Sequence, residues 1–84
     1  MSSSTGWMVV VVQRRQLDHT IASPEDALEL LLSDWPTNGG LPLISAMEAC
    51  AGAIAGTVSE EEAQYAFLEA ALDAGIDFEF KPSV

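Results

Sequence analysis

Apolar side chains recur along this chain with the spacing of strands at both ends and the spacing of helices between them. Residues 7–12 form an unbroken apolar, mostly β-branched run, which predicts a strand. Residues 13–18 are polar and turn-like, although they lack the Asn-Gly or Asp-Gly pair of a tight hairpin, and residues 19–22 are expected to return as a short strand. Residues 76–81 alternate apolar with charged side chains, which is typical of a half-buried strand, and Pro82 ends it.

The segment SPEDALELLLSDWP, residues 23–36, predicts a well-capped helix. Ser23 is a good N-cap, Pro24 takes the first helical position, and Asp26 follows where a capping box usually has Glu. Pro36 ends the helix because it disfavours helical backbone at the residue before it. The apolar stripe, at spacings of three and four, is expected to consist of Leu28, Leu31, Leu32 and Trp35, with Leu30 off the stripe.

Two further helices are predicted after a loop at residues 37–40. One begins near Leu41 and ends at Gly56, and its expected apolar face consists of Leu43, Met47, Cys50, Ala51 and Ile54. The other begins at Ser59, with Glu62 completing a capping box, and ends at Gly75. Its expected apolar stripe consists of Ala63, Ala66, Phe67, Ala70, Ala71 and Ala74.

This order of elements, β-β-α-α-α-β, indicates an α+β fold with two layers. If each short connection reverses direction, the last strand runs antiparallel to the first and pairs beside it, which gives the sheet order 2-1-3. A three-stranded antiparallel sheet is then packed on three helices. We expect one domain over residues 7–84 and a disordered N-terminal tail over residues 1–6.

The first strand is apolar on both of its faces, and the helices cover only one face of a sheet. Met8, Val10 and Val12 are expected on the open face, where charged neighbours would surround them. An apolar centre with a polar rim is the layout of a modest interaction face, for a partner protein or a second copy of the chain. Strand propensity alone explains the same valines, so both interpretations stay open.

Charge restricts the classes of partner. Thirteen acidic and three basic side chains give a formal net charge of −10. Nucleic acids and anionic membranes require cations that this chain lacks, so we expect it to bind neither. The acidity serves solubility, or it is recognised by a basic protein partner or mimics a nucleic acid. The first residues lack the features of a signal peptide, and the single Cys50 excludes an internal disulfide, so the cytoplasm is the expected location.

No combination of residues points to catalysis. His19 is the only histidine, and its neighbour Asp18 points to the opposite face of a strand. Cys50 lies on an apolar helix stripe, where a thiol is usually an inert core residue. The acidic pairs, such as Glu25 with Glu29, fall on helix surfaces, and no metal-binding or nucleotide-binding motif is present. We expect no catalytic residues, no cofactor and no metal, and therefore not an enzyme.

A set of ordinary motifs, in a particular order, resembles a known family. The motifs are Trp35-Pro36, Ala46 with Cys50, Gly56, the run from Ser59 to Phe67, Ala70-Ala71 and the run from Ala74 to Ile76. Together they resemble the small bacterial proteins of the domain of unknown function 982 family, over roughly residues 7 to 80. The resemblance implies a small bacterial α+β domain and assigns no catalytic residue. One departure is Gln64, which stands where the family pattern suggests Arg, so an anion contact there is not expected.

A second hypothesis places a small-ligand or regulatory site at the end of the first helix. Trp35 would lie beside the glycine-rich loop that carries Asn38, Gly39 and Gly40, and such a loop can move around a ligand. This hypothesis competes with the interaction face on the first strand. The sequence does not decide between them.

Overall fold

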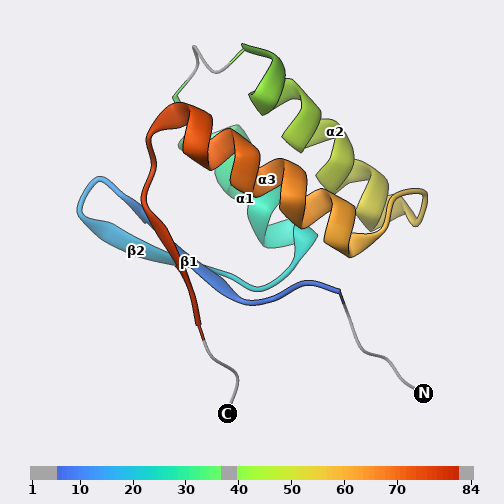
Figure 1. Cartoon of the computed structure of the whole chain (residues 1–84), viewed down its shortest axis with the longest axis horizontal. Helices are drawn as coiled ribbons and strands as arrows, with labels where there is room; N and C mark the ends of the chain where they lie inside the picture. Colours follow the sequence, from blue (N-terminus) through green and yellow to red (C-terminus); the bar gives the residue numbers. More distant parts are fainter. Residues whose placement is uncertain (1–5, 37–39, 82–84) are drawn as a thin grey trace.

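The computed structural model describes residues 6–36 and 40–81 and has the predicted order of elements. Figure 1 shows the arrangement. The strands are β1 (Val10–Arg14), β2 (Leu17–Ile21) and β3 (Phe78–Phe80). The helices are α1 (Pro24–Ser33), α2 (Gly40–Ala55) and α3 (Glu60–Ala74). Of the expected tail at residues 1–6, only Gly6 is among the described residues.

The sheet has the order β2-β1-β3 with both pairs antiparallel, as the sequence predicted. The N–H of Gln13 donates to the carbonyl of Asp77, and the N–H of Lys81 donates to the carbonyl of Val9, both at 3.0 Å. Backbone groups along an antiparallel strand point alternately to its two neighbours. The N–H and C=O groups of the odd-numbered β1 residues therefore point to β3, and those of the even-numbered β1 residues point to β2.

The hairpin between β1 and β2 is tighter than the sequence suggested. Two residues, Arg15 and Gln16, form the whole connection, with φ angles of 53° and 66°. Both angles lie in the left-handed region, as in the two-residue turns that match strand twist, where Asn and Gly are usual. An arginine and a glutamine hold these positions at some cost in backbone energy.

The helix ends follow the predicted capping. The Ser23 hydroxyl accepts a hydrogen bond from the N–H of Asp26 at 3.2 Å, and Ser59 accepts one from Glu62 at 3.1 Å. Gly75 adopts the left-handed conformation that ends α3, with a φ of 72°. These capping contacts satisfy backbone groups that the helices leave unpaired at their ends.

The core-facing side of α1 differs from the prediction at two leucines. Leu30 is 5% exposed and belongs to the core, whereas Leu32 is 69% exposed. Three successive leucines give a helical pattern that fits more than one orientation about the helix axis. The buried positions on α1 are Pro24, Ala27, Leu30 and Leu31. In α2 the predicted Ala51 and Ile54 are also exposed, the predicted Cys50 is buried, and Ala46 is buried without having been predicted.

Phe67 of α3 lies fully buried at the centre of the core. The rings of Trp7 and Trp35 contact it from two sides, with centroids at 6.1 Å and 5.5 Å. The helix α2 packs on α1 and α3, and Figure 1 shows it on the side remote from the sheet. The sheet is therefore covered on one face, and α1 passes beside β2.

Candidate functional site

The predicted interaction face does not lie where the sequence suggested. Val10 and Val12 are 0% exposed and belong to the core, so two of the three expected residues face the helices. Only Met8 is exposed, at 58%, and it precedes β1. The prediction was wrong because four successive valines carry no alternation that tells one face of the strand from the other. Val9 and Val11, half-buried, occupy the open side instead.

The second predicted site, at the end of α1, consists of a core residue and of a loop that lies mostly outside the described residues. Trp35 is buried against Phe67, so its indole serves packing. Within the described residues its Nε1 has no hydrogen-bond partner. Gly40 is the exposed first residue of α2, and Asn38 and Gly39 lie outside the described residues. The described residues do not form a ligand site around Trp35.

Cys50 is fully buried in α2. Desolvation by this burial raises the pKa of its thiol to about 11, so the thiol stays protonated at neutral pH. A protonated, inaccessible thiol is a poor nucleophile. Cys50 therefore acts as a small core residue, as its place in the sequence suggested.

A groove with a volume of about 420 Å³ lies between β2 and α1. Its strand side consists of Asp18, His19, Thr20 and Ile21. Its helix side consists of Asp26, Glu29, Leu30, Ser33 and Asp34. The two buried apolar side chains, from Ile21 and Leu30, form a floor beneath walls that are mainly acidic. We call this feature the β2–α1 groove.

The groove runs along the free edge of the sheet. Four consecutive residues of β2 line the groove. Because side chains alternate between the two faces of a strand, a groove on one face would meet only every second residue, so this groove follows the edge of β2. In β2 the residues paired with even-numbered β1 residues are Leu17, His19 and Ile21. The backbone groups of Asp18 and Thr20 therefore point away from β1, because β2 is an outer strand. Their N–H and C=O groups face the groove side of the sheet.

Two of the four carboxylates that line the groove are already engaged. Asp34, the C-cap of α1, accepts hydrogen bonds from Arg15 Nε at 2.9 Å and from Arg14 Nη2 at 3.1 Å. The hydrogen bond from Arg15 is the main cause that holds the pKa of Asp34 below 3.8, and it outweighs the opposing effect of desolvation. Asp26 accepts a hydrogen bond from the N–H of Ala22 at 3.1 Å, which completes the cap of α1.

Asp18 and Glu29 are the two uncommitted carboxylates of the groove. Among the described residues, neither side chain makes a hydrogen bond or an ion pair. Glu29 comes from the helix wall of the groove. Asp18 belongs to the strand edge, and its side chain points to the sheet face opposite to the buried Ile21 and the helices. The His19 Nε2 is buried and has no partner in this part of the chain, so the groove surface does not present it to a ligand.

The acidic groups are spread along the groove and do not converge on a point. Across residues 6–36 and 40–81, no three His, Cys, Asp or Glu side chains are placed to hold a metal ion. Carboxylates distributed along the length of a groove suit an elongated cationic ligand better than a single ion.

Sequence reasoning missed this site because it treated Glu29 as a helix surface residue. The signal was present in the helix, since Asp26, Glu29 and Ser33 recur at spacings of three and four beside Leu30. The β2 residues line the groove only because α1 passes beside the edge of that strand. No local sequence pattern predicts how these two elements are placed relative to each other.

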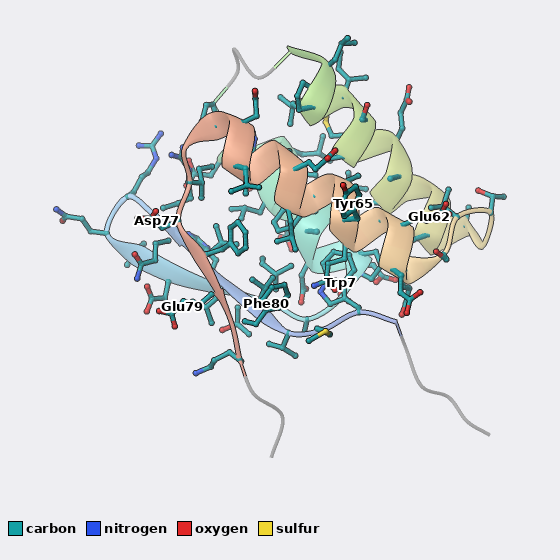
Figure 2. All side chains as sticks on the ribbon, viewed as in Figure 1. Trp7, Glu62, Tyr65, Asp77, Glu79 and Phe80 are labelled. Atoms are coloured by element: carbon teal, nitrogen blue, oxygen red, sulfur yellow. The ribbon has the colours of Figure 1, made fainter. Side chains whose placement is uncertain are left out.

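Large apolar side chains are also exposed away from the groove. In Figure 2, Tyr65 projects from α3, Glu79 and Phe80 come from β3, and Asp77 precedes that strand. Tyr65, Leu72 and Phe80 are exposed in α3 and β3, as are Leu41 and Ile44 in α2. These side chains lie on several elements, and none of them lines the β2–α1 groove.

Within the described part of the chain, no helix has both the length and the apolar character needed to cross a membrane. No curated protein and no solved structure matches the chain. A family model described as "Protein of unknown function (DUF982)" matches residues 8–78. That match covers β1, β2, all three helices and the first residue of β3, so the resemblance seen in the sequence is confirmed. The chain belongs to the DUF982 family.

Proposed function

We propose that this protein is a small acidic interaction module without enzymatic activity, and that it binds a partner protein in the β2–α1 groove. The observation that carries the proposal is the uncommitted carboxylate of Glu29 on the helix wall, above an apolar floor, with the uncommitted Asp18 at the strand edge beside it. Charged groups around a partly apolar centre are typical of transient protein interfaces. A basic partner would neutralise part of the net charge of −10.

The chemistry of the described residues supports a binding role over a catalytic one. The one thiol is buried and protonated at neutral pH, and the one histidine has no carboxylate partner within hydrogen-bond distance in the described part. General acid–base or nucleophilic catalysis needs such a pair, positioned by the fold. We place the protein in the cytoplasm of a bacterium, a compartment that suits a chain with a single cysteine.

The test compares two charge reversals with the same local chemistry. Glu29→Lys changes the groove, and Glu69→Lys changes the exposed surface of α3 by the same two charge units. Each glutamate stands four residues from another acidic side chain on its helix, Glu25 and Asp73 respectively, so the helix effects are matched. Partners are captured with tagged protein at native expression level and identified by mass spectrometry, and folding is checked by circular dichroism.

We expect a partner that the wild type and Glu69→Lys retain and that Glu29→Lys loses. The same difference should appear with the purified partner, as a dissociation constant about tenfold higher for Glu29→Lys. If no captured protein depends on Glu29, the groove is not a partner site and the proposal is wrong.

A further inference from the structure

We propose that the partner contributes an extended segment carrying Lys or Arg, which adds to the sheet as a fourth strand along the free edge of β2. This inference rests on the proposed function and specifies how the β2–α1 groove is occupied. Strand addition of this kind places an extended peptide against exposed backbone groups of an edge strand. Here the helix α1 supplies a second wall beside that edge.

The backbone of β2 has the unpaired groups that strand addition needs. Asp18 and Thr20 direct their N–H and C=O groups outward, and no residue in the described part of the chain pairs with them. They lie two residues apart, or about 6.8 Å along the strand. Alternate residues of an extended segment repeat at the same distance, so one segment can bond to both.

The dimensions of the groove also suit a short extended chain. The β2 lining covers residues 18–21, which span about 10 Å in strand conformation. The α1 lining covers residues 26–34, whose helical rise gives about 12 Å. A segment of about four residues would occupy this length, with its side chains alternately directed into and out of the groove.

The charges determine which side chains the segment carries. Glu29 and Asp18 have no other partner among the described residues, and the remaining carboxylates are held by Ala22 and by the two arginines. A guanidinium or ammonium group directed toward α1 would therefore pair with Glu29, and one on the neighbouring residue of the segment, directed to the open face of the sheet, would pair with Asp18. The buried Ile21 and Leu30 below favour the aliphatic part of a Lys or Arg side chain.

The probe is a library of eight-residue peptides, acetylated and amidated, with one fixed Lys or Arg and all other positions varied. The full chain selects peptides, and the selected sequence is then made with single N-methyl groups at each backbone position in turn. N-methylation removes one backbone donor and leaves the side chains unchanged. Amide hydrogen exchange of Asp18 and Thr20 is measured by nuclear magnetic resonance with and without the peptide.

If the inference holds, a basic peptide binds and slows amide exchange at Asp18 and Thr20. N-methylation should then weaken binding by about tenfold at alternate positions only, because every second residue faces β2. Glu29→Lys should weaken binding by a similar factor, and Glu69→Lys should not.

A different outcome separates the two proposals. Binding that requires Glu29 but neither slows these amides nor responds to N-methylation would overturn strand addition and leave the partner groove in place. A groove-dependent protein partner with no selected peptide would likewise overturn the extended segment. If neither a partner nor a peptide depends on Glu29, both proposals are wrong.

Discussion

The side chain of Gln64, in α3, makes the two hydrogen bonds with the Met8 backbone that a neighbouring strand would otherwise make. Its side-chain oxygen accepts a hydrogen bond from the Met8 N–H at 3.0 Å, and its side-chain nitrogen donates to the Met8 carbonyl at 2.5 Å. Gln64 is buried, and only a primary amide can both donate and accept in this geometry. One side chain therefore fixes the segment that leads into β1 against the helix layer.

Replacing Gln64 with Glu should destabilise the protein by about 1–3 kcal/mol, because the Met8 carbonyl loses its donor and a carboxylate is buried. Chemical denaturation monitored by circular dichroism measures the free energy of unfolding. Gln16→Glu makes the same change at an exposed residue of the hairpin turn and should stay within about 0.5 kcal/mol of the wild type. Equal effects of the two variants would show that the Met8 contact contributes little.

At the scale of elements, the sequence predicted those features that depend on a few neighbouring residues. The capping serines Ser23 and Ser59 and the terminating Gly75 occupy their expected places, and the strand order follows from short connections. The orientation of β1 was not predictable, because its valines are equivalent on both faces. The β2–α1 groove was not predictable either, since it arises where two elements pass each other in space.

The hairpin and α1 are linked by the contact of Arg14 and Arg15 with Asp34, and this contact should respond to acid. Because the pKa of Asp34 is lowered in the folded state, its stabilising effect is fully present above pH 3.8. The effect is lost as pH falls from 3.8 through the lower folded-state pKa. The difference in unfolding free energy between wild type and Asp34→Asn should therefore shrink over that range.

Urea denaturation between about pH 2.5 and pH 6 measures this difference, since the other carboxylates titrate in both proteins alike. Asp18→Asn provides the matched control, because Asp18 makes no ion pair in the described part of the chain. A difference between wild type and Asp34→Asn that stays constant down to pH 2.5 would contradict the role assigned to the arginines.

At the scale of the whole molecule, the net charge is strongly negative, and the few basic side chains are not spread evenly among the carboxylates. Two of the three basic side chains, Arg14 and Arg15, pair with Asp34, so most carboxylates have no nearby cation. Net charge of one sign repels itself and opposes the compact state. The fold is maintained against this repulsion by the core around Phe67.

Salt should therefore stabilise the protein at neutral pH. Raising sodium chloride from about 0.01 M to 0.15 M shortens the screening length from about 30 Å to 8 Å, which reduces repulsion among distant carboxylates. We expect the melting temperature to rise by a few degrees, as measured by calorimetry. The same series at about pH 4, where many carboxylates are protonated, should show a smaller rise. A melting temperature that falls with salt at pH 7 would contradict this account.

The arginine contacts with Asp34 also limit what a partner sequence can contain. They place positive charge at one end of the β2–α1 groove, while the uncommitted Asp18 and Glu29 leave the rest negative. A second basic residue that reached that end would meet like charge, so a long polybasic stretch gains nothing over an isolated cation. The groove would thus distinguish partners by the spacing of their charges as well as by their number.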